Sequence, residues 1–186
     1  MKFNYERFIS LDDRYEVSEY IKKCNLPIIG SGSSRIVYKI SIPGYEPSVI
    51  KFSYSSNKFK YEQNKQEVYF YQNKKNKLIP RIFNWHPEFV WIEMEFLKAI
   101  PSTKKLLSLI GIERRSELSN ADILPTHKSP VMKEAIKLVQ DFGLVPCDIT
   151  VPYHWGLDRY GKLKICDFGW TEEIRKKVIL SSYGFL

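Results

Sequence analysis

The sequence predicts an α+β fold of two lobes, and three observations support this prediction. Five extended, largely apolar stretches occur in the first part of the 186-residue chain, with one helical pattern after the third. The second part changes to amphipathic helical patterns. It then contains a β-hairpin pattern that ends in an acid. We therefore expect a helical extension over 1–25, a five-stranded lobe over 26–97 and a shortened, mainly helical lobe over 98–186.

The first lobe follows a helix and contains a second one. Ser10 precedes the acids Asp12 and Asp13, which is the pattern of an N-cap, so we expect a helix from Ser10 to about Cys24. Another helix is expected over 57–73, a charged and aromatic stretch without proline or glycine. The strands are expected at 26–29, 35–42, 48–52, 80–84 and 89–96.

The second lobe is predicted from two helices and one hairpin. Helical patterns cover 106–112 and 131–142, and the second of these repeats its apolar residues on one face. The stretches 155–157 and 163–166 flank a short polar turn, which predicts a β-hairpin. Gly161 occupies the turn position that requires a positive φ.

Composition excludes several classes of protein. Hydrophobic residues make up 44% of the chain and charged residues 27%, the balance of a water-soluble globular protein. No apolar run approaches the roughly 18 residues of a membrane span, and the N-terminus lacks the apolar core of a signal peptide. Cys24, Cys147 and Cys166 form no C-x-x-C pair, which argues against a disulfide framework or a zinc ribbon. We expect a cytoplasmic protein without a membrane partner.

The net charge of +8 favours contact with polyanions such as nucleotides, nucleic acids or acidic proteins. The lysines are dispersed along the chain, however, and the aromatic residues lie mostly within apolar runs. A solvated basic surface is therefore favoured over a nucleic-acid interface.

A glycine-rich turn between the first two strands is the first candidate site. Glycine allows the backbone to approach a phosphate closely, with amide N–H groups as donors. The turn is expected to be a hairpin with an unusually open tip. The alternative to a phosphate site is a common Ser/Gly hairpin tip without such a role. The candidate residues are Gly30, Ser31, Gly32, Ser33, Ser34, Arg35 and Val37.

Lys51 strengthens this candidate because it interrupts the third strand. An ammonium group inside a sheet is costly unless it is paired, which suggests a phosphate or carboxylate partner. Glu67 in the helix over 57–73 is the expected carboxylate, and Glu62 on a different face is the fallback.

Two aspartates complete the set of candidate site residues. Asp167 ends an apolar strand and is followed by Phe168 and Gly169, so it is well placed to hold a cation. Asp148 follows the helix over 131–142 and precedes the hairpin. Two aspartates on neighbouring loops, a lysine and a glycine turn are the working residues of a phosphoryl-transfer site.

In this order the motifs resemble those of the protein kinases, in a shortened form similar to small kinase-like proteins of bacteria and their phages. The resemblance implies a bilobal kinase-like fold in which Gly30, Gly32 and Val37 cover a nucleotide. It also implies that Lys51 and Glu67 form the ion pair that orients the nucleotide phosphates.

The remaining roles follow from the same resemblance. Met94 matches the gatekeeper position, and Glu95, Phe96 and Leu97 would face adenine. Asp148 matches the catalytic aspartate and Asp167 the metal-binding one, with ATP and Mg²⁺ (or Mn²⁺) as the implied cofactors.

The chain also departs from the kinase pattern. Arg35 replaces the third glycine of the nucleotide loop, where it would either clash with the phosphates or hold them. Pro146 and Cys147 replace the His-Arg pair before the catalytic aspartate. Counting back from the hairpin places His154 at the second metal-binding position, although imidazole is a poor ligand for Mg²⁺.

Two functions are therefore carried forward. The first is an ATP- and Mg²⁺-dependent phosphotransferase that modifies Ser or Thr of a protein. The alternative is an inactive kinase-like module that binds a protein partner, for example between a phage and its host. If the protein is a phosphotransferase, we expect Lys51, Glu67 and Asp167 to converge between the lobes.

Overall fold

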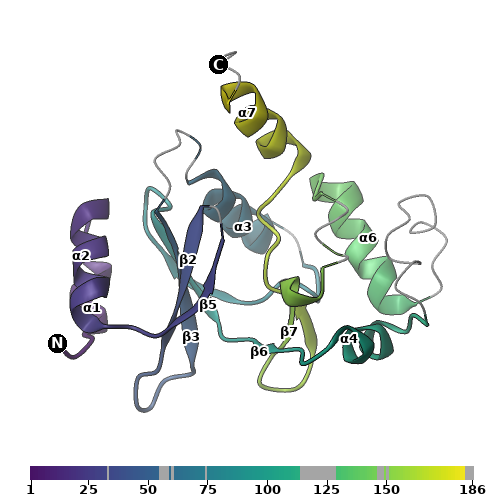
Figure 1. Cartoon of the computed structure of the whole chain (residues 1–186), viewed down its shortest axis with the longest axis horizontal. Coiled ribbons are helices and arrows are strands. Elements are labelled where there is room, and N and C mark those ends of the chain that lie inside the picture. Colours follow the sequence, from purple (N-terminus) through teal and green to yellow (C-terminus); the bar gives the residue numbers. More distant parts are fainter. Residues whose placement is uncertain are drawn as a thin grey trace. The chain divides into compact units, whose positions relative to one another are not determined.

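The computed structural model describes residues 1–32, 34–54, 59, 61–73, 75–113, 129–145, 149 and 151–182. These residues form a mixed α+β structure with one five-stranded sheet and one three-stranded sheet (Figure 1), which confirms the predicted class. The chain divides into two compact units. Unit 1 comprises 1–64 and 82–96, and unit 2 comprises 65–81 and 97–186.

The N-terminal segment of unit 1 contains two helices, α1 (Tyr5–Ile9) and α2 (Arg14–Cys24), where one was expected. The N-cap of α2 is Asp13, whose carboxylate accepts hydrogen bonds from the Tyr15 and Glu16 amides, so the prediction of Ser10 was wrong. Ser10 instead ends α1, because its hydroxyl donates to the Arg7 carbonyl at 2.9 Å. Ser10 and Asp13 are both of a type that can cap a helix, and Asp13 is the one that caps α2.

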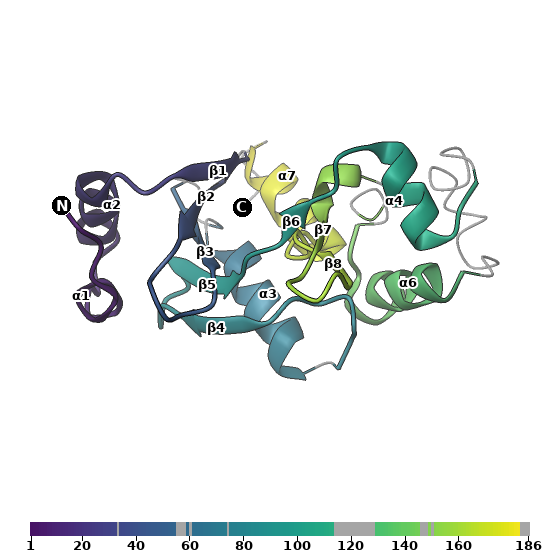
Figure 2. The ribbon, with the colours of Figure 1, turned by 90° about the horizontal axis from the view of Figure 1, so that it is seen from below.

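The five-stranded sheet is antiparallel throughout. Its strands lie in the order β1-β2-β3-β5-β4, which can be followed in Figure 2. The helix α3 (Glu62–Asn73) follows β3, as the sequence predicted, but it begins later than the expected residue 57, because Phe59 and Tyr61 lie in turns. The strands are β1 (Ile28–Ser31), β2 (Arg35–Ile40), β3 (Ser48–Ser53), β4 (Ile82–Trp85) and β5 (Trp91–Glu95).

One face of this sheet, the helix-covered face, packs against α1 and α2. Strand residues Tyr38, Ile50 and Trp91 form one apolar cluster with Phe8 and Ile21 of the helices. The opposite face is named the Lys51 face. Residues that pair directly across strands share a face, and alternate residues of a strand do too. The Lys51 face therefore carries Arg35, Val37, Lys39, Val49, Lys51, Ile92 and Met94.

Unit 2 combines helices with the predicted hairpin. The hairpin strands β7 (Trp155–Leu157) and β8 (Leu163–Ile165) pair as expected, and Gly161 has φ +75° at the turn. A two-residue strand, β6 (Lys98–Ala99), adds to β7. The helices are α4 (Thr103–Ile110), α6 (Pro130–Phe142) and α7 (Glu172–Ser182), with a 3₁₀ turn over Pro152–His154. Within the described ranges, no helix has the length and apolar character needed to cross a membrane.

Candidate functional site

The Lys51 face of the sheet carries four of the predicted nucleotide-binding residues of unit 1, Arg35, Val37, Lys51 and Met94, whereas Glu95 has the register of the opposite face. Val37 pairs directly with Lys51, and Met94 pairs with Val49, so all four side chains lie on one face. Lys51 is only 4% exposed, and Met94 is equally buried. Gly30 pairs with Val37 at the end of this row. The strand pairing thus brings together residues that lie about 60 positions apart in the sequence.

The residues on either side of the tip of the glycine turn are hydrogen-bonded to each other. The Gly32 N–H donates to the Arg35 carbonyl at 2.9 Å, which leaves only Ser33 and Ser34 between the paired residues. The Tyr54 hydroxyl also donates to the Gly32 carbonyl at 2.7 Å. Ser33 lies outside the described residues. One amide that could have bound a phosphate is therefore used to close the turn.

Arg35, at the position of the third kinase glycine, turns into the protein. It is 6% exposed, and its guanidinium donates to the Asn64 side-chain carbonyl at 3.3 Å. The guanidinium is thus bound to Asn64 of α3.

Asn64 links α3 to three parts of the sheet and was missed by the sequence analysis. It is fully buried, and its amide lies 3.0 Å from the Ser53 hydroxyl and 2.9 Å from the Phe89 carbonyl. The same amide lies 3.3 Å from the Lys51 carbonyl. A polar residue near the start of a helix is usually exposed. In the sequence, the burial of Asn64 was indicated only by its position three residues before Glu67.

Glu67 lies one helical turn after Asn64, on the same face of α3. Its side chain is 0% exposed, whereas the fallback residue Glu62 is only half-buried. Glu67 is thus the more buried of the two candidate carboxylates. Lys51 belongs to unit 1 and Glu67 to unit 2.

The segment predicted to face adenine passes from unit 1 to unit 2. Glu95 is buried, and the Phe96 N–H donates to the Pro47 carbonyl at 3.1 Å. The Lys39 ammonium lies 4.4 Å from the centre of the Phe96 ring, a cation–π contact.

Leu97 packs so closely on β7 that a Cβ on Gly156 would lie 2.6 Å from the Leu97 Cβ. Only glycine fits at position 156 without displacement.

In unit 2 the two predicted metal ligands lie close together. His154 Nε2 is 3.8 Å from Asp167 Oδ2, and the two side chains are 15% and 35% exposed. The Cys166 N–H donates to the His154 carbonyl at 2.7 Å, which fixes the backbone on both sides of this pair. The hairpin between them is what brings residues 154 and 167 together.

Phe168 anchors Asp167 to the helices of unit 2. It is 1% exposed, and its ring stacks at 6.4 Å from the ring of Phe70 on α3. The Phe70 ring also contacts Phe142 of α6 at 4.0 Å. Asp167 is thus held beside a buried aromatic side chain while its own carboxylate remains partly exposed.

Asp148, the predicted catalytic base, lies outside the described residues. Its neighbour Ile149 is fully buried, and the Trp155 indole N–H donates to the Ile149 carbonyl at 3.0 Å. The residue next to Asp148 is therefore tied to the start of β7.

The donor set of this pair fits Mg²⁺ only in part. Among the described residues, no three His, Cys, Asp or Glu side chains gather to hold a metal ion. Mg²⁺ is commonly bound by one or two carboxylates together with substrate phosphates, so Asp167 could serve in that way. His154 adds a nitrogen that Mg²⁺ does not prefer.

Comparison with known proteins adds no family: no protein-family model matches the chain, and no curated protein matches it in sequence.

Proposed function

We propose that this protein is an ATP- and Mg²⁺-dependent, protein-kinase-like phosphotransferase acting on Ser or Thr of a protein. The observation that carries the proposal is the place of Lys51. Its ammonium side chain lies on a central strand, is 4% exposed and shares a face with Val37 and Met94. A buried cation beside apolar side chains suits the phosphate and the base of a nucleotide.

The roles of the residues follow from their chemistry. Lys51 would contact the α- and β-phosphates, with Glu67 holding its ammonium in place. Asp167 would hold Mg²⁺, which when bound neutralises charge on the phosphate oxygens. Asp148 would accept the proton of the attacking hydroxyl as a general base.

A second candidate is a kinase-like module that binds a partner without catalysis, and two contacts favour it. Gly32 uses its N–H to close its own hairpin, so that amide is engaged before any phosphate arrives. His154 stands beside Asp167 where a hard oxygen ligand would suit Mg²⁺ better.

The test incubates the full-length protein and a protein acceptor with γ-labelled ATP, in Mg²⁺ and separately in Mn²⁺. Transfer to Ser or Thr supports the enzyme. Asp148→Asn and Asp167→Asn should each reduce transfer by two or more orders of magnitude, because the amide neither accepts the proton nor replaces the charge. Asp141→Asn, an exposed position at the end of α6, is the matched control and should retain full activity.

A binding measurement separates the two candidates. ATP with Mg²⁺ should raise the melting temperature of the wild-type protein by mass action. Lys51→Met should abolish this shift, while Lys75→Met at an exposed position should not. Nucleotide binding without transfer would favour the non-catalytic module, and neither binding nor transfer would overturn the proposed function.

A further inference from the structure

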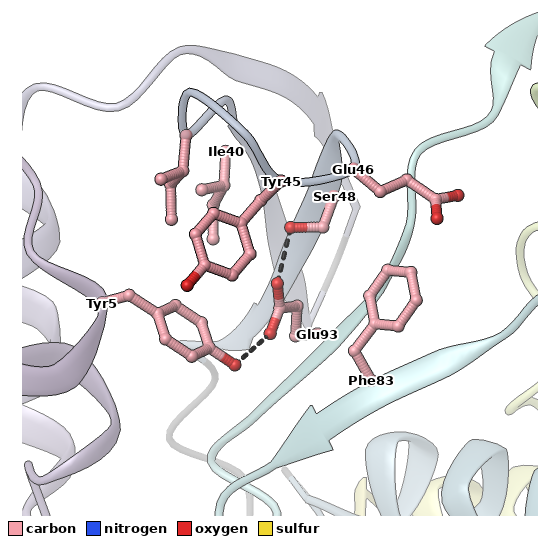
Figure 3. A pocket seen from close by; sticks show the side chains of 8 residues that line it. Tyr5, Ile40, Tyr45, Glu46, Ser48, Phe83 and Glu93 are labelled. Carbon is pink, nitrogen blue, oxygen red and sulfur yellow. Dashed lines mark hydrogen bonds between the residues drawn. The ribbon is translucent and has the colours of Figure 1, made fainter.

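A pocket of about 240 Å³ opens on unit 1. It lies between α1, the turn before β3, and strands β4 and β5. Figure 3 shows the rings of Tyr5, Tyr45 and Phe83 around the carboxylate of Glu93. Glu93 points to the helix-covered side of the sheet, because its neighbours Ile92 and Met94 belong to the Lys51 face.

The carboxylate of Glu93 is buried and bound by neutral donors. The residue is 6% exposed, the Ser48 hydroxyl donates to Oε1 at 2.6 Å and the Tyr5 hydroxyl donates to Oε2 at 2.5 Å (Figure 3). Within the described part of the chain, Glu93 forms no ion pair. Each carboxylate oxygen can accept a further hydrogen bond. A buried carboxylate without a cation is costly, so a ligand that supplies positive charge would be favoured here.

The phenol of Tyr5 is a fixed donor in this arrangement. Burial, together with its hydrogen bond to Glu93, raises the pKa of Tyr5 to about 12. The Asn84 amide also donates to the Tyr5 oxygen at 3.3 Å. Tyr5 therefore remains protonated at neutral pH and donates its hydrogen bond to Glu93. A neutral phenol does not balance the negative charge of Glu93, so an incoming group can do so.

We propose that this pocket binds an alkylammonium ion. The ammonium group would donate to the Glu93 carboxylate, and its alkyl chain would lie against the rings of Tyr5, Tyr45 and Phe83. Aromatic faces attract cations, and aromatic rings combined with an acid are a recurring means of recognising ammonium groups. The pocket is smaller than the usual site of a drug-sized ligand, which limits the ligand to a short chain. A metal ion fits less well, because ring carbons replace the oxygen ligands it would need.

The test is a titration of the isotopically labelled full-length protein with n-butylammonium chloride, followed by amide NMR shifts at constant ionic strength. We expect saturable shifts at Ser48 and Glu93, and no comparable shifts with n-butanol, which has a similar shape without charge. Tyr45→Ala should weaken binding about two- to fivefold through the lost cation–π contact. Tyr45 is 74% exposed, so its removal leaves the core unchanged.

Glu93→Gln should weaken binding at least about tenfold, because a charge-assisted hydrogen bond is replaced by a neutral one. Since Glu93 is buried, the melting curve of Glu93→Gln is recorded first to show that the variant folds. If it does not fold, the binding measured for Tyr45→Ala tests the proposal. Tyr15→Ala, an equally exposed tyrosine outside the pocket, is the control and should bind as the wild type does.

Two sources of the ammonium group can be distinguished with the same protein. N-acetyl-lysine methylamide should match or exceed n-butylammonium if the pocket accepts a lysine side chain of a peptide. Weaker binding of the lysine derivative would indicate a free small amine. Equal binding of n-butanol, or no saturable binding of n-butylammonium, would overturn the proposal.

Discussion

The two faces of the five-stranded sheet are built from the same strands but stabilised by different forces. The helix-covered face is an apolar cluster in which Phe8 lies 4.7 Å from Trp91. The Lys51 face carries three cationic residues, Arg35, Lys39 and Lys51, among its apolar ones. Of these, Arg35 is bound by Asn64 and Lys39 lies over Phe96.

This difference indicates a division of tasks between the faces. Hydrophobic burial on the helix-covered face stabilises the sheet. Charged groups on the Lys51 face contribute less to stability than apolar groups in the same volume. Arg35 and Lys51 are nevertheless buried on this face, whereas Lys39 is half-buried. Four substitutions would break or sharpen this comparison.

The largest expected effect is on the helix-covered face. Phe8→Ala removes a fully buried ring that contacts Trp91 and Tyr20, so we expect a loss of about 3–5 kcal/mol of unfolding free energy. Urea denaturation followed by tryptophan fluorescence measures it. A loss below about 1 kcal/mol would mean that the N-terminal helices are not part of this core.

The next effect is on the polar network of the Lys51 face. Asn64→Leu is nearly isosteric, but it leaves the Ser53 hydroxyl and the Phe89 carbonyl without their donor. We expect a loss of about 2–4 kcal/mol in the same assay. Asn73→Leu, at an exposed position of the same helix, should change stability by less than about 0.5 kcal/mol. Equal losses of unfolding free energy in the two variants would show that the hydrogen bonds of Asn64 do not stabilise the fold.

A pH-dependent effect should come from Tyr5. Because the pKa of its phenol is raised to about 12 in the folded state, its stabilising contribution is complete below pH 10, the ordinary pKa of tyrosine. It is lost as the pH rises from 10 to 12, where the unfolded chain ionises first. Water reaches part of the ring and screens the carboxylate, so we expect a loss of about 1 kcal/mol.

Comparison with Tyr5→Phe isolates this contribution from those of the other tyrosines. The variant should lose about 1 kcal/mol less than the wild type between pH 9 and pH 12, as measured by denaturation at several pH values. Parallel pH curves for the two proteins would show that Tyr5 is not coupled to Glu93.

The smallest effect concerns Lys39. Lys39→Met keeps the length of the side chain and removes the charge over the Phe96 ring, so we expect a loss of about 0.5–1 kcal/mol. Lys75→Met, at an exposed position, is the matched control. No difference between the two lysine variants in melting temperature would show that the cation–π contact contributes nothing.

Much of the fold could be predicted from local patterns. Extended, largely apolar stretches predicted all five strands of the large sheet, and the hairpin around Gly161 was confirmed, because these features depend on residues close in sequence. The helices α1 and α7 and the strand β6 were missed. α1 and β6 are short, with five and two residues, so their periodicity is too brief to be recognised.

The site was harder to predict, because its contacts join distant residues. Strand register places Val37, Lys51 and Met94 on one face, whereas the sequence had related them only through the kinase resemblance. The inward turn of Arg35 could not be foreseen, since it depends on Asn64 about 30 positions later. The Glu93 pocket was missed too, although two glutamates, Glu93 and Glu95, within a buried five-residue strand were a usable signal. The nucleotide, the metal ion and the kinase-like arrangement of the lobes remain predictions.

The close contact between Gly156 and Leu97 offers a genetic tool. An alanine at position 156 would force its methyl group against the Leu97 Cβ, while the side chains of Lys51, Asp148 and Asp167 stay unchanged. Overpacking of this kind costs about 1–3 kcal/mol, which for a chain of this length lowers the melting temperature by roughly 2–12 °C. Gly156→Ala is therefore expected to behave as a temperature-sensitive allele. Shifting cells that carry it from low to high temperature would remove the protein within one culture and expose the process that depends on it.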